Sequence, residues 1–191
     1  MNFEQLYYMG DAQLRGALHV NPRTDIADPY ALHRREDIPS EPIVYEYSMG
    51  GAPKDLIGTG LPPLKLLSDR VIDLFQENQF TGWATYPIEL YGKKKEKITD
   101  YQGFSVTGRC GKIDNSLSKR EWREPPVPQG KRYRTWVGLY FDLKTWDGSD
   151  IFVPESNGYT IVTERVKIAI EKAKFKNIYF ERLTEFERMM Y

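Results

Sequence analysis

One four-residue pattern occurs twice in this 191-residue chain, and it constrains the fold more than any other feature. SDRV occupies residues 68–71 and TERV occupies residues 163–166, so the offset between them, 163 − 68, is 95 residues. A hydroxyl residue followed by an acid is typical of a helix start, because the hydroxyl can accept an early backbone N–H and the acid faces the positive end of the helix dipole. Each copy therefore predicts a capped helix.

The same offset relates the residues that follow the two copies. Three apolar residues at i, i+3 and i+4 define one helix face in each copy: Val71, Leu74 and Phe75, then Val166, Ala169 and Ile170. Gly82 and Asn177, which tolerate the left-handed conformation, then precede a strand pattern. We predict two similar capped helix-to-strand units at about 66–88 and 161–183. They are either an internal repeat or the chance recurrence of a common design.

Strand and helix patterns elsewhere in the chain are mixed without regular βαβ alternation. The pattern predicts a helical turn at 30–35, a hairpin at 89–108 with its tip at Gly92–Lys97, strands at 2–9, 42–49 and 135–143, connections at 50–65 and 109–134, and a helical tail at 184–191. This order favours an α+β fold with a mixed, mainly antiparallel sheet.

Length and charge bound the class of protein. The chain is long enough for one domain, residues 1–191, within which residues 1–62 either join the same core or pack less tightly. Lys plus Arg and Asp plus Glu both number 27, so no overall positive field favours nucleic acid. The absence of an apolar run of bilayer length and the single cysteine predict a cytoplasmic protein without membrane contact.

No catalytic or metal-binding pattern is evident, and we predict neither a cofactor nor a metal. His19 and His33 lack metal-ligand spacing, and Cys110 reads as a small residue at a strand end. The glycine-rich segment at 48–60 lacks the Lys-Ser/Thr ending of a phosphate loop. The enzyme alternative uses Asp114, Asp147 or Asp150 with an arginine, and it requires these carboxylates to converge in one pocket.

The segment at 118–136 is the most informative for binding. It interleaves six basic residues with three aromatic ones: Lys119, Arg120, Arg123, Lys131, Arg132 and Arg134, with Trp122, Tyr133 and Trp136. Aromatic and arginine side chains on an exposed segment favour contact with a protein or a nucleic acid. A solvated surface loop is the alternative.

Two stretches together carry a family resemblance. GFSVTGRCGKIDNSLSKRE and YFDLKTWDGSDIFVPESNGYTIVTERVKIAIEKAKFKNIYFERL resemble immunity proteins of bacterial polymorphic toxin systems, a group with a C-terminal Ser/Thr-Glu-Arg-Val helix. The matching positions are Ile113, Asp114 and Ser116, then Gly148, Asp150 and Phe152. The resemblance covers about residues 64–183. The chain lacks the cysteine pairs of the similar double CxxCG group, so zinc binding is not implied.

The resemblance implies a non-enzymatic binding protein that neutralises a cognate toxin by direct protein contact. Its partner-binding residues are expected among Asp114, Ser116, Trp122, Arg123, Arg132, Tyr133, Arg134, Trp146, Asp147 and Asp150. A small enzyme with a carboxylate and arginine site, and a weak nucleic-acid-binding protein that uses residues 119–136, are the alternatives. Neither the toxin nor the oligomeric state is predicted.

Overall fold

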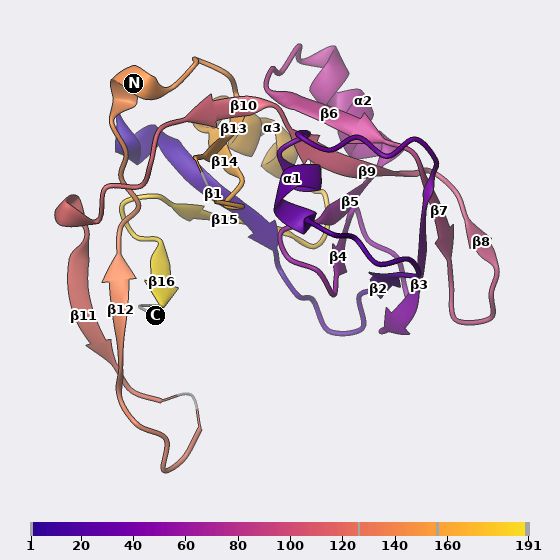
Figure 1. Cartoon of the computed structure of the whole chain (residues 1–191), viewed down its shortest axis with the longest axis horizontal. Helices are drawn as coiled ribbons and strands as arrows, with labels where there is room; N and C mark the ends of the chain where they lie inside the picture. The colour runs from indigo at the N-terminus through magenta and orange to yellow at the C-terminus, as the bar shows by residue number, and fades with distance from the viewer. Residues whose placement is uncertain (1, 126, 156, 190–191) are drawn as a thin grey trace.

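The computed structural model describes residues 2–125, 127–155 and 157–189, and the fold is α+β as predicted (Figure 1). The helices are α1 (Pro29–His33), α2 (Asp69–Glu77) and α3 (Glu164–Ala173), with 3-10 turns η1 (Phe3–Gln5), η2 (Asn115–Leu117) and η3 (Leu143–Thr145). The strands are β1 (Leu6–Asp11), β2 (His19–Pro22), β3 (Ile43–Met49), β4 (Leu56–Thr59), β5 (Lys65–Ser68), β6 (Trp83–Tyr86), β7 (Ile88–Tyr91), β8 (Lys97–Ile98), β9 (Tyr101–Val106), β10 (Gly108–Cys110), β11 (Lys119–Arg123), β12 (Tyr133–Val137), β13 (Ile151–Pro154), β14 (Ile161–Thr163), β15 (Ile178–Arg182) and β16 (Glu187–Met189).

The strands form three sheets. Their orders are β10-β13-β14-β1-β15, β6-β9-β5-β4-β2-β3-β7-β8 and β11-β12-β16. Within the described part of the chain, paired strands are antiparallel except at β10–β13, β2–β4 and β3–β7. The predicted mixed, mainly antiparallel arrangement is therefore confirmed.

The two helix-to-strand units are also confirmed. Helix α2 follows β5 and leads to β6, and α3 follows β14 and leads to β15. Each helix buries its predicted apolar face, with Val71 and Phe75 in the first and Val166 and Ile170 in the second. Gly82 (φ 88°) and Asn177 (φ 68°) are left-handed as expected, although both lie in the connection to the strand, beyond the end of the helix.

The predicted capping role of the two hydroxyl residues is wrong in its detail. Ser68 and Thr163 do stand at the N-cap positions, but neither side chain accepts a hydrogen bond from its helix. Each hydroxyl donates instead to a buried carboxylate, Ser68 to Asp55 at 3.1 Å and Thr163 to Asp150 at 3.2 Å. A buried carboxylate needs several donors, so it competes for the hydroxyl that would otherwise cap the helix.

These two carboxylates reciprocally join the two halves of the chain, which the offset of 95 residues defines as residues 1–95 and 96–191. Asp55 in the first half accepts the backbone N–H of Lys176 from the second half at 2.8 Å. Asp150 in the second half accepts the backbone N–H of Thr81 from the first half at 3.0 Å. Both pairs keep the offset of the sequence pattern, since 150 − 55 and 176 − 81 both equal 95. Each half is thus held by a carboxylate of the other.

The arginines of the repeated pattern cross between the halves in the same way. Arg70 pairs with Asp55 at 3.5 Å and lies over the ring of Phe175. Arg165 pairs with Asp150 at 3.2 Å and lies over the ring of Phe80. Both arginine side chains are mostly exposed, so these ion pairs contribute less than the buried hydrogen bonds around the same carboxylates.

The halves also exchange a strand. Strand β1 lies between β14 and β15 of the second half, and β9 lies between β5 and β6 of the first half. The register repeats the offset, because Leu6 pairs with Thr163 while Tyr101, 95 residues after Leu6, pairs with Ser68. The repeated sequence pattern is therefore part of a structural repeat that extends to strand register and hydrogen bonding. Chance recurrence of a helix start does not explain it.

The largest apolar cluster draws on both halves, as the exchange requires. Its buried members come from β1, β4, β5, α2, β9, β13, β14 and α3, among them Tyr7, Met9, Leu56, Leu67, Val71, Phe75, Phe104, Val106, Ile151, Val162, Val166 and Ile170. Residues 1–62 contribute to it through β1 and β4, where Met9 and Leu56 are fully buried.

Several segments differ from the sequence expectation. The expected connection at 50–65 contains β4 and the first residue of β5, the expected connection at 109–134 contains β11, and the expected helical tail contains β16. The strand expected at 135–143 begins earlier, at Tyr133, and ends at Val137. The sequences of β11 (KREWR) and β16 (ERM) are short and rich in charged residues, and pairing with a neighbour, rather than intrinsic preference, makes them strands. Strand β4 (LIGT) is short and lies in a segment that glycine and proline interrupt. The expected helical turn and the tip at Gly92–Lys97 are confirmed by α1 and the β7–β8 pair. The rest of the hairpin expected at 89–108 is wrong, because β9 pairs with β5 and β6 and not with β7.

We propose that strand exchange makes the chain a single cooperative unit, and the carboxylates test this. Asp55→Ala and Asp150→Ala should each lower the free energy of unfolding by about 2–4 kcal/mol, because several buried donors lose their acceptor. Urea unfolding followed by fluorescence and circular dichroism should show one transition for both halves. Asp73→Ala, at an exposed position of α2, is the matched control and should change stability by less than about 0.5 kcal/mol. Two separate transitions in the unaltered protein would contradict the proposal.

Candidate functional site

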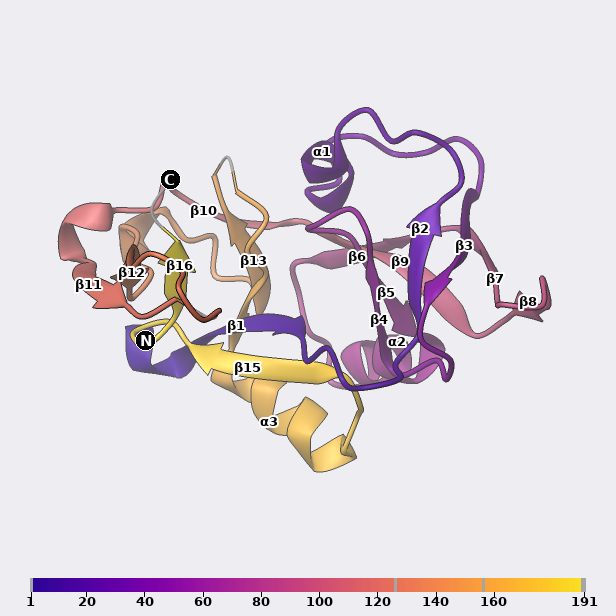
Figure 2. The same cartoon turned by 90° about the horizontal axis from the view of Figure 1, so that it is seen from below.

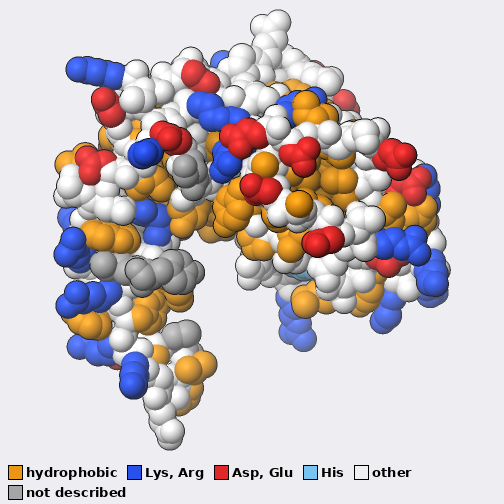
Figure 3. Space-filling model, viewed as in Figure 1, with side chains coloured by type: hydrophobic (Ala, Val, Ile, Leu, Met, Phe, Trp, Pro, Cys, Tyr) orange, Lys and Arg blue, Asp and Glu red, His pale blue; other side chains and the backbone are white. Residues whose placement is uncertain are grey.

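The β11–β12 hairpin projects from the rest of the molecule (Figure 1). Strand β16 pairs with β12 at the base of the hairpin, and β11 forms the free edge of this small sheet. Figure 3 shows a wide hollow between the hairpin and the part of the molecule that carries β2 and β3. The predicted binding segment is therefore an extended arm that borders a concave surface.

One face of the hairpin carries two arginine–tryptophan pairs. Trp122 lies opposite Arg134 and Arg120 lies opposite Trp136 in the antiparallel register. The guanidinium of Arg134 is 4.8 Å from the Trp122 ring, and that of Arg120 is 4.6 Å from the Trp136 ring. The Trp122 side chain is large and apolar, yet the residue is 53% exposed. Exposed tryptophan and arginine on a rigid strand pair are typical of binding hot spots.

The opposite face of the hairpin anchors it. Arg123 donates to Glu121 at 2.6 Å and to Glu187 of β16 at 3.0 Å, and these carboxylates raise the pKa of Arg123 further above its usual range. The buried Thr135 hydroxyl donates to the backbone oxygen of Arg188 at 2.8 Å. Arg123 thus helps to hold the arm in position. Tyr133, the first residue of β12, is half-buried.

The remaining predicted residues near the arm are tied to local partners. Asp114 caps η2 and accepts both the N–H and the hydroxyl of Ser116, which lowers the pKa of the exposed Asp114 carboxyl. Arg132 pairs with Glu124 at 2.8 Å, and both side chains are largely exposed. These residues surround the hairpin, and the structure places them near the surface rather than in a common cavity.

The predicted turn at Trp146 to Phe152 is built into the scaffold. The Trp146 indole N–H donates to the Ser149 oxygen at 3.1 Å, and its ring lies 5.3 Å from that of Phe152. Asp147 accepts the Arg109 N–H at 2.8 Å. Asp150 is 6% exposed and satisfied by donors from both halves. Asp150 is therefore an internal residue and not part of an exposed binding surface.

The carboxylates of the enzyme alternative have different surroundings. Asp114 accepts a backbone N–H of η2, Asp147 accepts the backbone N–H of Arg109, and Asp150 joins the two halves by accepting the backbone N–H of Thr81. None of them lines the cleft described next. In the described ranges no group of three or more His, Cys, Asp or Glu side chains could hold a metal. Burial also raises the pKa of the Cys110 thiol to about 12, so it stays protonated near neutral pH.

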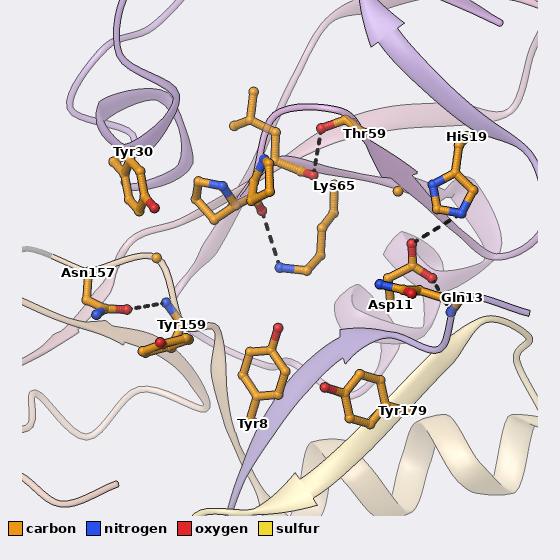
Figure 4. A pocket seen from close by; sticks show the side chains of 15 residues that line it. Tyr8, Asp11, Gln13, His19, Tyr30, Thr59, Lys65, Asn157, Tyr159 and Tyr179 are labelled. Atoms are coloured by element: carbon orange, nitrogen blue, oxygen red, sulfur yellow. Dashed lines mark hydrogen bonds and ion pairs between the residues drawn. The ribbon is translucent and has the colours of Figure 1, made fainter. Parts of the chain in front are cut away.

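A cleft of about 510 Å³ lies where the two halves face each other (Figure 4). Strands β1 and β15 supply one wall, and β2, β4, β5 and the segment before β5 supply the other. The lining residues are Tyr8, Asp11, Gln13, His19, Tyr30, Gly58, Thr59, Pro62, Pro63, Leu64, Lys65, Asn157, Gly158, Tyr159 and Tyr179. Aromatic walls with a few polar groups are typical of a binding cleft.

Lys65 stands out among the lining residues because it is a buried cation. The residue is 6% exposed, and its Nζ donates to the Pro63 oxygen at 3.2 Å and to the Thr160 hydroxyl at 3.4 Å. Burial lowers the pKa of Lys65 to about 8, against the opposing influence of Asp11. At neutral pH the amine is therefore still mainly charged, at a cost of up to about 3 kcal/mol relative to an exposed lysine.

The other polar groups of the cleft are arranged around this amine. The Tyr8 ring packs edge-on against Tyr179 and Tyr159, with centroids 5.7 and 6.0 Å apart. Burial raises the pKa of Tyr8, so its hydroxyl remains a hydrogen-bond donor. Asp11 accepts the Gln13 N–H at 2.7 Å and lies 3.9 Å from the His19 ring nitrogen. The cleft thus combines aromatic walls, hydroxyl donors and one buried ammonium.

Both histidines now have an explained position. His33 is fully buried and its Nε2 lies 3.2 Å from the Thr160 hydroxyl, the group that also accepts from Lys65. Burial, Lys65 and Arg109 lower the pKa of His33, so the ring is neutral near neutral pH. His33 therefore supports the floor of the cleft from behind, whereas His19 lines the cleft itself.

The sequence analysis missed this cleft because its walls come from four distant parts of the chain. One signal was available. Lys65 interrupts the apolar run LPPLKLLS, and a lysine inside a buried strand is expensive unless it has a partner or a task. The position of this lysine in the same cleft as Tyr8 and Tyr179 depends on strand exchange and has no local sequence signature.

The fold and these two features describe an α+β protein built around interaction surfaces, and the comparison with known families agrees. The sequence matches the Immunity protein family (Imm11) over residues 7–185. The chain belongs to this family, which confirms the resemblance to immunity proteins and implies a toxin-neutralising immunity function. No curated protein is significantly similar to the chain. Among the described helices none is long and apolar enough to cross a membrane.

The cost of the buried lysine yields a stability prediction. The folded-state pKa of Lys65, about 8, lies below the ordinary value of 10.5, so folding is opposed fully below pH 8 and not at all above about pH 10.5. Lys65→Met should raise the free energy of unfolding at pH 7 by about 1–3 kcal/mol, and this gain should shrink as the pH rises from about 8 to about 10.5. Urea unfolding at several pH values measures it.

Lys97→Met is the control for this prediction, because Lys97 is exposed on β8 and forms an ion pair with Glu89 at the surface. It should change stability by less than about 0.5 kcal/mol at every pH. A loss of stability in Lys65→Met at pH 7 would mean that the two hydrogen bonds of the amine outweigh its desolvation, and the interpretation of Lys65 as a costly residue would be wrong.

Proposed function

We propose that this protein neutralises a cognate bacterial toxin in the cytoplasm by direct protein–protein contact, without catalysis. Family membership supports the immunity function, and the hairpin face that carries the exposed Arg120, Trp122 and Arg134 beside the half-buried Trp136 supports the mode of action. Desolvation of tryptophan and arginine on a preordered hairpin gives affinity with little loss of side-chain entropy. The hairpin and the hollow beside it would together receive the toxin.

The rigidity of the hairpin is central to this proposal. Arg123, Glu187 and Thr135 hold its inner face to β16, so the outer face is presented without help from the toxin. Arg120 and Arg134 remain available for hydrogen bonds, because both residues are exposed and a guanidinium that lies over a ring keeps N–H groups directed away from it. Such a face suits a toxin surface that offers carbonyl or carboxylate acceptors beside an apolar pocket.

Nucleic-acid binding through residues 119–136 is the weaker reading of the same arm. Arg123 and Arg132 are already paired with carboxylates, which leaves fewer cations to displace the counterions of a phosphate backbone. Binding of labelled RNA or DNA that falls steeply with salt would favour this reading over toxin contact.

The test is co-expression with the toxin domain encoded by the neighbouring gene. The unaltered chain should restore growth and co-purify with the toxin, and Trp122→Ala with Arg134→Ala should weaken the complex by about 10-fold or more. Both side chains are exposed, so unfolding by urea should be nearly unchanged. Ile168→Ala, at a 55% exposed position of α3 on another element, is the matched control and should bind normally.

Two results would contradict the proposal. Rescue of growth without any complex would exclude occlusion by direct contact. Normal affinity of the Trp122→Ala and Arg134→Ala protein would show that the toxin binds elsewhere on the chain.

A further inference from the structure

The cleft at Lys65 contains a buried charge without a counter-ion. Both hydrogen-bond partners of the amine are neutral oxygens, of Pro63 and Thr160, although an ammonium has three donors. Within the described ranges no carboxylate lies within 4.0 Å of Lys65 Nζ. The acid of the cleft, Asp11, is engaged by Gln13 and His19. Buried charges in proteins are normally paired, so we expect the third N–H donor of Lys65 to bind an anionic partner.

The direction of the amine points to a ligand in the cleft. In Figure 4 the Lys65 side chain extends into the cleft toward the hydroxyl of Tyr8, and the hydroxyl of Tyr179 points toward the Tyr8 ring. Thr160, bound to the buried His33, holds the amine from one side. The donors are thus ordered before any ligand binds, which lowers the entropy cost of binding.

The charge of the cleft selects a single carboxylate. A phosphate carries a charge of about −1.5 to −2 and usually needs several cations, whereas this cleft has one lysine and a nearby Asp11 that would repel a dianion. One monoanionic carboxylate matches one ammonium. The faces of Tyr30, Pro62 and Pro63 suit the short aliphatic stem of such a side chain and the chain segment that carries it.

We propose that the cleft is a second contact site for the toxin and receives one Asp or Glu side chain, whose carboxylate becomes the counter-ion of Lys65. This inference rests on the proposed function. The position fits it, because the cleft lies between the β1–β15 side, which continues toward the hairpin, and the β4–β5 side, which continues toward β2 and β3 (Figures 1 and 2). A toxin seated against the hairpin in the hollow could extend a loop into the cleft.

Binding of the catalytically inactive toxin domain from the neighbouring gene, measured by calorimetry, tests the proposal. Lys65→Met should weaken binding by about 10-fold or more while the protein itself becomes more stable, so a folding defect cannot account for the loss. Lys97→Met, a surface lysine on β8, should bind within about twofold of the unaltered chain. Conversion of each toxin Asp and Glu to Asn and Gln should reveal one position whose effect disappears in the Lys65→Met background, as a double-mutant cycle requires.

The pH dependence provides a readout that a purely structural lysine would not produce. From about pH 7 to about pH 9 the affinity of the unaltered chain should fall as the ammonium is lost, and Lys65→Met should lack this component. The variant keeps the other titratable groups that face the amine: Tyr8, Asp11, His19, His33, Tyr159 and Tyr179. Removal of Lys65 relieves one of the influences that lower the pKa of His33, but burial still holds that pKa below its ordinary value of 6.5 and thus below this pH range.

The outcomes separate this inference from the proposed function. Undiminished binding by Lys65→Met, with binding lost in Trp122→Ala, would overturn the cleft contact and leave the toxin-binding function in place. Loss of binding in Lys65→Met that no toxin carboxylate shares in the double-mutant cycle would also overturn it. Absence of a complex with the unaltered chain would overturn both.

Discussion

The rest of the structure depends on two buried carboxylates that each accept hydrogen bonds from both halves of the chain. Asp55 holds the backbone at Lys176, and Asp150 holds the backbone at Thr81. These bonds fix the turn that leads from each helix into its strand, and that strand in turn holds the β1 or β9 strand contributed by the other half. Because a buried carboxylate is costly without its donors, we expect that neither half keeps its geometry alone.

Strand exchange also explains where the cleft lies. It brings Tyr8 of β1 and Tyr179 of β15 opposite Lys65 of β5, residues that no local pairing would join. The equivalent strand, β9, which the second half contributes to the sheet of the first half, has Gly103 at the position that matches Tyr8, and the ring of Tyr86 occupies the space beside it. The repeat is therefore symmetric in its scaffold and asymmetric in its surfaces, and only one copy forms this tyrosine-lined opening.

The two candidate surfaces would bind a partner through different interactions. The hairpin offers exposed tryptophan and arginine on an arm that β16 holds in place, and such a face stabilises a complex mainly by desolvation. The cleft offers one buried ammonium, which opposes folding until a partner supplies its counter-charge. A residue that lowers the stability of the free protein and faces an opening is best explained by binding, since natural proteins retain such costs mainly where function needs them.

Local chemistry in the sequence determined the helices, their apolar faces, the left-handed Gly82 and Asn177 and the mixed fold class, because these depend on residues within one turn or one strand of each other. It also carried the family relationship. Tertiary structure alone decided that KREWR is a strand, that Ser68 and Thr163 serve carboxylates and not their own helices, and that Asp150 is internal. Each of these depends on a partner that is 10 to 69 residues away along the chain, from Arg123 opposite Tyr133 to Thr81 bound to Asp150. The free energy of such long-range pairing has no counterpart in local propensity.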